Sequence, residues 1–312
     1  MAYNNLIARS NVTALIPEDV SNEIVQNVAT QSAALQLFRH VTMSTNQQRM
    51  PVLAALPSAF FVNGDTGFKQ TTEVAWANKF LFAEEIAAIV PIPEAVLDDS
   101  GFDVWGEIRP RLEEAIARVL DAAIFFGTNK PASWPTDVAT AAIAAGNTFN
   151  RGTSTAALGG IAEDLNQLMG LLEADGYDPN GFVTRTTYKA RLRSARDTTG
   201  QKLLDVNTSS IEGSPLVYAM PGMWPSGAGS AEMFAGDFTQ GIIAIRKDIT
   251  YKILDQAVIQ DGGTGVIQYN LAQQDMIALR VVARYGWQVP NPINYEQTTE
   301  ANRYPFAVLR AP

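Results

Sequence analysis

Few residues in this sequence have the types and the spacing that catalysis or metal binding requires. His40 is the only histidine, and a single histidine cannot form a histidine-based metal cluster. We expect it at the end of a helix, where a cation is favoured. The acidic pairs Glu84–Glu85 and Asp98–Asp99 could form an acid/base couple. Adjacent acids more often cap helices or face solvent, which is the interpretation we favour.

Two glycine-rich or acidic stretches resemble ligand loops only in composition. Residues 262–265 read Gly-Gly-Thr-Gly, but no Lys-Ser/Thr follows as in a phosphate-binding loop. Residues 175–181 are acidic like a calcium loop, yet their spacing does not match an EF-hand and no glutamate closes them. Both stretches are predicted to be turns. The sequence therefore predicts no catalytic residues, no cofactor and no metal site, and an enzyme of mixed α/β fold remains a minor alternative.

One short stretch concentrates positive charge, and two kinds of contact could explain it. The cations could contact phosphate groups, or they could pair with acidic neighbours within the chain or across subunits. The chain is acidic overall, and only Tyr188 supplies an aromatic ring among the cations. We therefore favour protein contacts. The stretch comprises Arg185, Lys189, Arg191, Arg193 and Arg196.

The composition sets further bounds on the protein. A net charge of −9 argues against a dedicated nucleic-acid reader, because such a protein usually needs a basic face. The same net charge still allows a protein that encloses nucleic acid without binding it tightly. There is no cysteine for a disulfide framework. No apolar run reaches the roughly 18 residues of a membrane span. A chain of 312 residues can form one or two domains with a large core.

The element that organises the chain is a long amphipathic helix predicted from Ser100 to Gly127. Ser100 and Asp103 have the spacing of a capping box, and Gly127 is a natural stop. The predicted length is roughly 40 Å, and Pro110 predicts a kink or a second start within it. Apolar residues, Val119 among them, recur at helical spacing on one face. The opposite face is predicted to carry a charged stripe, formed by Arg111, Glu114, Arg118 and Asp121.

Before this helix, the pattern predicts helices from Pro17 to near His40, followed by an extended hairpin from Gln48 to Pro93. The segment 59–62 is strand-like, and turn residues fill 62–74. A lone hairpin is marginally stable in water. We therefore expect the aromatic residues of this hairpin to contact another subunit. They are Phe60, Phe61, Phe68, Trp76, Phe80 and Phe82.

After the helix, residues 129–157 are predicted to be a loop region with short pieces of structure and a candidate domain boundary. An amphipathic helix is predicted over 158–172, a basic helix over 186–196, and a long strand over 276–285, with several shorter strands between them. Helices and strands alternate, which indicates a mixed α and β architecture. The tail after Val289 is rich in proline and shows little periodicity.

The order of these elements resembles the major capsid proteins of tailed bacteriophages, which have the Hong Kong 97-type fold. The resemblance covers roughly residues 16 to 306 and rests on the order of short motifs. It implies an α+β fold with an N-terminal arm, an extended hairpin loop, a long spine helix, and peripheral and axial domains. The motifs are Ile16–Val20 with Ser32–Ala33, Gln48–Pro93, Val90–Glu94 followed by Leu97–Ser100, Gly236–Phe238 through Ile249–Thr250, and Gln274–Arg280.

The resemblance divides the chain into five parts. We expect the arm in residues 1–47, the extended loop in 48–93, the peripheral domain with the spine helix in 94–156 and the axial domain in 157–265. Residues 266–312 are expected to return to the peripheral domain and to form the C-terminal tail. Arm, hairpin and tail are expected to drape over neighbouring subunits in a shell that needs a rigid plate and adaptable edges.

The function that the resemblance implies is a structural subunit that assembles into hexamers and pentamers of an icosahedral head around double-stranded DNA. It implies non-specific DNA contact, possible portal and decoration proteins, no membrane, and a place in the virion capsid after assembly in the host cytoplasm. About 45 residues precede the loop and the chain begins with Met1, so we expect a separate scaffolding protein. The same fold also builds encapsulin compartments around cargo enzymes, which is the main alternative.

Some members of the family cross-link a loop lysine to an asparagine of a neighbour with the help of a glutamate. Lys69 resembles the lysine, but Asp275 stands at the asparagine position and Val282 at the glutamate position. An acid cannot lose ammonia to form that bond, so we expect no cross-link. Our candidates for subunit contacts are Phe68, Lys69, Trp76, Arg111, Glu114, Arg118, Arg185, Arg191, Arg193 and Arg196.

Overall fold

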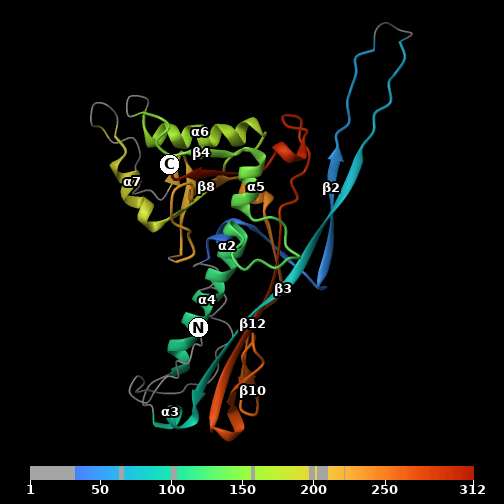
Figure 1. The fold of residues 1–312 in the computed structure, drawn as a ribbon. Coiled ribbons are helices and arrows are strands. Elements are labelled where there is room, and N and C mark those ends of the chain that lie inside the picture. The colour runs from blue at the N-terminus through green and yellow to red at the C-terminus, as the bar shows by residue number, and fades with distance from the viewer. Residues whose placement is uncertain are drawn as a thin grey trace.

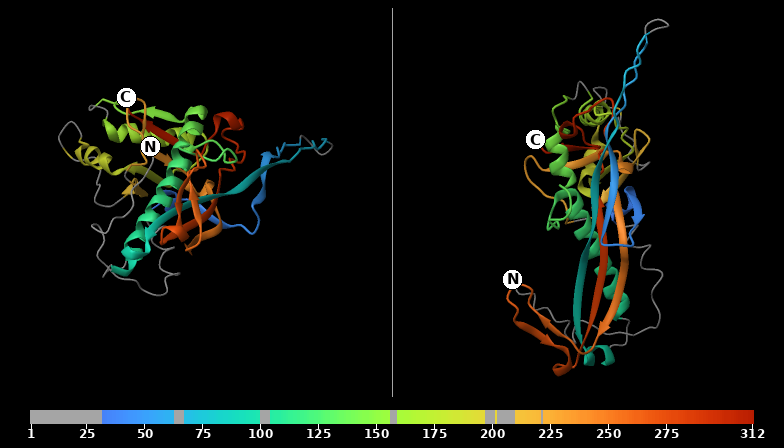
Figure 2. Two further views of the ribbon diagram at one scale, coloured as in Figure 1. Left: turned by 60° about the horizontal axis from the view of Figure 1, so that its bottom comes forward. Right: turned by 90° about the vertical axis from the view of Figure 1, so that its right-hand side faces the viewer.

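The computed structural model describes residues 32–62, 67–99, 104–155, 159–196, 201, 210–220 and 222–312. Figure 1 shows an elongated molecule, in which a long helix and several long strands run side by side below a second, more compact layered part. The hairpin formed by β2 and β3 extends beyond both parts (Figures 1 and 2). Helices and strands are mixed along the chain, as the sequence predicts.

The lower part is built on a five-stranded sheet with the order β1-β9-β12-β3-β2. Strand β12 is its centre, because it pairs antiparallel with β3 on one side and with β9 on the other. The β12–β3 register runs without interruption from Met276 opposite Pro93 to Gly286 opposite Ala83. The five strands are β1 (Arg39–Thr42), β2 (Gln47–Ala55), β3 (Ala75–Pro93), β9 (Ile242–Leu254) and β12 (Met276–Gln288).

Helix α4 (Val104–Phe126) is the predicted long helix, and the short helix α3 (Glu94–Asp99) connects it to β3. Its 23 residues correspond to about 34 Å, and Pro110 lies inside it. It ends at Gly127, whose φ of 67° is the left-handed conformation that a helix stop favours. The predicted capping box lies at residues 100–103, outside the described residues. The apolar face is buried, with Leu112, Ile116, Leu120 and Ile124 in the main core.

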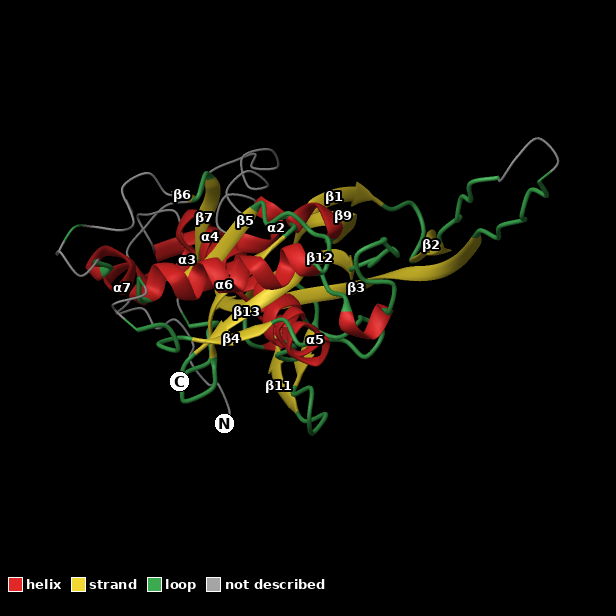
Figure 3. Cartoon of the chain, turned by 90° about the horizontal axis from the view of Figure 1, so that it is seen from above, coloured by secondary structure: helices red, strands yellow, loops and turns green. Residues whose placement is uncertain are grey.

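The upper part is a six-stranded sheet with the order β4-β13-β8-β5-β7-β6. Helices cover both faces: α6 and α7 lie on one side, and α5 with the end of α4 lies on the other. Side chains of β8 alternate between the two sides, because Phe234 joins the α4 core while Met233 joins the α6 cluster. Figure 3 shows α6 crossing this sheet and α7 beyond one end of α6. The elements are α5 (Val138–Ala145), β4 (Thr148–Asn150), α6 (Ile161–Ala174), β5 (Gly181–Arg185), α7 (Lys189–Ser194), β6 (Ser210–Ile211), β7 (Ser214–Ala219), β8 (Ala231–Gly236) and β13 (Phe306–Arg310).

The remaining elements are short. Helix α2 (Ala33–Leu37) lies on α4, and β10 (Val258–Gln260) pairs with β11 (Ile267–Asn270) around the predicted glycine-rich turn. This small hairpin stands off the lower end of the molecule (Figure 2, right). Within the described ranges, four single-turn 3₁₀ helices connect the larger elements. They are η3 (Thr186–Tyr188), η5 (Phe238–Gln240), η6 (Leu271–Gln273) and η7 (Glu300–Asn302).

Two local predictions are wrong. His40 lies in strand β1 and not at a helix end, because Arg39–Thr42 pair with Ile242–Ile245 of β9. Residues 59–62 form no strand, since β2 ends at Ala55. Residues 129–157 combine loop with two short elements, α5 and β4, in agreement with the prediction. The helices predicted from Pro17 onward fall largely on residues 1–31, outside the described residues.

The C-terminal tail is also more ordered than predicted. Strand β13 is buried in the interior of the six-stranded sheet, between β4 and β8. The preceding segment braces the base of the hairpin, because Ile293 N donates to Leu53 O at 3.2 Å and Tyr295 Oη donates to Pro57 O at 3.0 Å. Lys79 adds an ion pair to Glu300 at 2.6 Å. These bonds hold the tail on its own chain, so it is not free to drape over a neighbour.

Candidate assembly surfaces

The extended hairpin presents an apolar surface that the described part of the chain does not cover. Strands β2 and β3 pair antiparallel from Gln47 opposite Phe82 to Ala55 opposite Ala75. Trp76, opposite Leu53 in the paired part, is 68% exposed, and Phe68, which lies beyond the paired part, is 95% exposed. Lys69 is exposed beside Phe68. Large exposed aromatics on an extended element are typical of a surface that another molecule covers.

The predicted charged stripe of α4 is only partly as expected. Arg118 donates to Glu114 at 2.7 Å and Arg111 approaches the same carboxylate at 3.5 Å, so these three side chains form one chain of charges on the helix surface. The Glu114–Arg118 pair has the favourable acid-first order. Asp121, which was predicted in this stripe, is fully buried. Val119, which was predicted in the apolar face, is 45% exposed.

Asp121 fastens the start of α2 to the middle of the long helix. Its carboxylate accepts from Ser32 Oγ at 2.6 Å, from Ala33 N at 2.9 Å and from Ala34 N at 3.2 Å. It thereby satisfies backbone donors at a helix start that have no partner within the helix. Burial raises the pKa of Asp121 to about 6, and these hydrogen bonds oppose the rise. A lone acid among the apolar residues of a helix was the sequence signal for this role.

A second buried acid lies between α4 and the five-stranded sheet. Glu113 accepts from the Tyr251 hydroxyl of β9 at 3.1 Å, and the Arg109 guanidinium lies 5.7 Å from the centre of the Tyr251 ring. Burial raises the pKa of Glu113, and the Tyr251 hydrogen bond and the Arg109 charge oppose that rise. This contact ties the first half of the long helix to the sheet.

The basic stretch is split between the interior and the surface. Glu232 of β8 is 1% exposed, and three guanidinium groups converge on its carboxylate: Arg151 at 2.5 Å, Arg185 at 3.4 Å and Arg191 at 3.9 Å. The acidic neighbour of Arg185 and Arg191 therefore lies within the chain. A single glutamate inside an otherwise apolar run, Ala231–Gly236, was the sequence signal for it. Arg193 and Arg196 are exposed.

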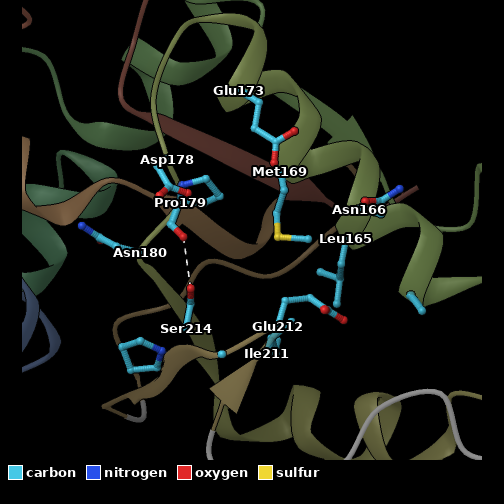
Figure 4. Close-up of a pocket in the computed structure, with 13 residues that line it drawn as sticks. Leu165, Asn166, Met169, Glu173, Asp178, Pro179, Asn180, Ile211, Glu212 and Ser214 are labelled. Carbon is cyan, nitrogen blue, oxygen red and sulfur yellow. Dashed lines mark hydrogen bonds between the residues drawn. The ribbon is translucent and has the colours of Figure 1, made fainter.

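A pocket of about 920 Å³ lies between α6 and the β6–β7 turn. Figure 4 shows Leu165, Met169 and Ile211 among its lining residues, and the hydrogen bond from Ser214 Oγ to Pro179 O at 3.1 Å beside them. Three carboxylates line it as well: those of Glu173, Asp178 and Glu212, all exposed. No sequence spacing reveals this pocket, because its residues come from three separate segments.

Neither a metal centre nor a membrane helix emerges in the described ranges. No group of three or more His, Cys, Asp or Glu side chains in these ranges could hold a metal ion. No described helix is long and apolar enough to cross a membrane. The surfaces that stand out are thus the hairpin with its exposed aromatic residues, the charged face of α4, and the exposed charged residues of the upper part.

Comparison with known proteins gives a consistent picture over nearly the whole chain. The sequence model of the phage capsid family matches residues 13–293. The major capsid protein of Staphylococcus phage 80alpha is 25% identical over 306 residues, which is 96% of this chain and 89% of that protein. A solved structure from Microbacterium phage Oxtober96 is 37% identical with a TM-score of 0.79, covering 98% of this chain and 99% of that one. A structure from Mycobacterium phage Adephagia is 32% identical with a TM-score of 0.80, covering 98% of each chain.

Proposed function

This chain belongs to the phage capsid family, and from that premise we propose that it forms the hexamers and pentamers of an icosahedral head around double-stranded DNA. It is a major capsid protein, a structural subunit of the virion shell. The family match over residues 13–293 carries this conclusion, since it spans most of the chain. It favours the phage head over a cargo compartment and over an enzyme, and we expect no catalytic activity.

The fold provides the two properties that a shell subunit needs. A rigid plate comes from α4 packed along the five-stranded sheet and from the six-stranded sheet covered on both faces. An extended contact element comes from the hairpin, whose aromatics have no cover in the described part of the chain. We propose that Phe68, Lys69 and Trp76 contact a neighbouring subunit. Such contacts repeat around the shell, so many modest interfaces add up.

The charged candidates have different expected roles. Arg111, Glu114 and Arg118 lie on the surface of α4 and are proposed to face a neighbour in the assembled shell. Arg193 and Arg196 are proposed as subunit contacts of the upper part, whereas Arg185 and Arg191 already neutralise Glu232. The five-part division into arm, loop, peripheral and axial domains and return remains our proposal. Three strands lie outside its residue ranges, because β4 and β13 belong to the six-stranded sheet of the upper part and β9 belongs to the five-stranded sheet of the lower part.

We also propose the partners and the place of assembly. With a net charge of −9, the protein is proposed to retain DNA through counterions and through confinement inside the shell, and not through tight binding. The free subunit should therefore bind DNA weakly and in a salt-sensitive way. A separate scaffolding protein, a portal and possible decoration proteins complete the head, which assembles in the host cytoplasm.

Electron microscopy of the chain purified from infected or co-expressing cells tests the proposal. Icosahedral shells that hold DNA, or that form only with a scaffolding partner, are expected. Small shells around a protein cargo, or a discrete monomer, would contradict it.

A pair of variants tests the hairpin. Trp76→Ser should leave the unfolding of the free subunit unchanged within about 0.5 kcal/mol, because the side chain is exposed, while it lowers the yield of shells. Val266→Ser in the turn between β10 and β11 is the matched control, since it removes an exposed apolar side chain outside the extended hairpin and outside the α4 face. Equal shell yields for the two variants would exclude a hairpin contact.

A further inference from the structure

The upper part carries two separate surfaces of opposite charge. The first, the acidic pocket, is the pocket described above with the carboxylates of Glu173, Asp178 and Glu212 around an apolar floor. The second, the basic patch, consists of Arg193 and Arg196 at the end of α7 and just after it, both exposed. None of these five side chains forms an ion pair with another residue in the part of the chain that the structure describes.

The two surfaces share no lining residue, because the acidic pocket extends along α6 from Ala162 to Glu173 whereas the basic patch adjoins the start of that helix. Arg196 lines a small hollow together with Gly160 and Ile161 at the start of that helix. Glu173 lies in its last turn, about 18 Å farther along the axis. One copy of the chain can therefore contact one neighbour through its acidic pocket and another neighbour through its basic patch. A contact that joins two different patches of the same chain is heterologous, and repetition of such a contact around an axis closes a ring.

We propose that the acidic pocket of one subunit receives the basic patch of a second copy of this chain. This inference rests on the proposed function, since it names a contact within the shell. The chemistry of the pocket suits arginine in particular. An arginine stem can lie on the apolar floor formed by Leu165, Met169 and Ile211 while its charged head stays at the rim. Its planar guanidinium can then pair with carboxylates in a two-pronged geometry.

Other occupants fit the acidic pocket less well. Three carboxylates repel an anionic ligand such as a phosphate. The described ranges contain no set of acids spaced to hold a metal ion. The remaining kind of occupant is a side chain with an apolar stem and a positively charged head. The arginines of the basic patch in this chain are side chains of that kind. Contact of the basic patch with DNA is the competing possibility, and it becomes one outcome of the test.

Charge reversal tests the pairing. Glu212→Arg and Arg193→Glu each place like charges together, so each should lower the yield of assembled shells by at least about tenfold. The double variant with both changes restores opposite charges and should recover most of the yield. Arg193→Glu combined with Asp255→Arg is the matched control, because it has the same net charge but places the new arginine at an exposed position outside the pocket. This control should remain defective.

The readouts separate the possible failures. Shell yield is measured by sedimentation, and circular dichroism with urea unfolding of the free subunits shows that each variant folds. Single variants that fold and assemble like the unmodified chain overturn the pairing, while shells of the unmodified chain still support the proposed function. A defect in Arg193→Glu that Glu212→Arg neither shares nor repairs also overturns it and assigns the basic patch to DNA or another surface. Absence of shells from the unmodified chain with its scaffolding partner contradicts the proposed function itself.

Discussion

Replacement of Asp121 should loosen the attachment of α2 to the long helix. The carboxylate is fully buried and accepts three hydrogen bonds, one from the Ser32 hydroxyl and two from backbone amides. In Asp121→Ala those donors lose their acceptor, and each buried donor without a partner costs about 1–3 kcal/mol. We expect the free energy of unfolding of the free subunit to fall by about 3–5 kcal/mol. The serine hydroxyl can rotate toward another acceptor, which keeps the loss below the full sum.

The pH dependence of the same site gives a sharper test. The pKa of Asp121 is raised from 3.8 to about 6 in the folded chain because burial disfavours the charged form. The folded state therefore holds the proton more tightly than the unfolded state. The resulting stabilisation is fully present below pH 3.8 and is lost as the pH rises through about 6. A shift of this size corresponds to about 3 kcal/mol.

Asp121→Asn is the matched variant for that measurement. Asparagine keeps the shape and one acceptor oxygen but does not titrate. Urea unfolding of both free subunits at several pH values between 4 and 7.5 gives the difference in their free energies of unfolding. The advantage of the aspartate over the asparagine should shrink by about 2.5 kcal/mol across that range, because part of the full effect is already lost at pH 4. Two parallel pH profiles would show that Asp121 does not titrate in this window and would refute the reasoning.

Three further predictions rest on single contacts. Glu232→Ala leaves three arginines without their buried partner and should lower the free energy of unfolding, measured by urea titration, by about 3–5 kcal/mol. An equal loss in the control variant Asp255→Ala would contradict this prediction. Gly241→Ala places a Cβ against the ring of Phe38 and should lower the free energy of unfolding by about 1–3 kcal/mol through overpacking. An unchanged thermal midpoint would argue against that packing. Assembled shells boiled in detergent should run as one monomer band, because Asp275 cannot condense with a lysine; a ladder of heavier bands would disprove this.

The local pattern of the sequence was sufficient for the elements whose shape depends on near neighbours. The long helix, its apolar face and its end at Gly127 follow from a 3.6-residue period and from a glycine that tolerates a positive φ. The pairing of β2 with β3 follows from two extended runs joined by turn residues. Phe68 and Trp76 are exposed, and their contact with another subunit stays a prediction.

Contacts between distant parts of the chain could not be read from the sequence alone. The tail from Val289 looked irregular, yet β13 pairs with β8 and β4 in the interior of a sheet. Its short apolar run is compatible with loop, strand or helix until a partner strand is known. His40 was placed at a helix end for the same reason, since its strand forms only through pairing with β9.

The charged residues show most clearly the difference between what the local sequence determines and what long-range contacts decide. The sequence alone determined that Asp121 recurs at helical spacing with Arg118 and that five cations cluster between residues 185 and 196. Only the tertiary structure decided that the buried Asp121 carboxylate accepts hydrogen bonds from the start of α2, 87 to 89 residues away. It also decided that Glu232 forms ion pairs with two of the five cations. A helical period fixes which side chains share a face, but the partner that a face meets is set by long-range packing. A buried charge is retained where that packing supplies its hydrogen bonds or its counter-charge.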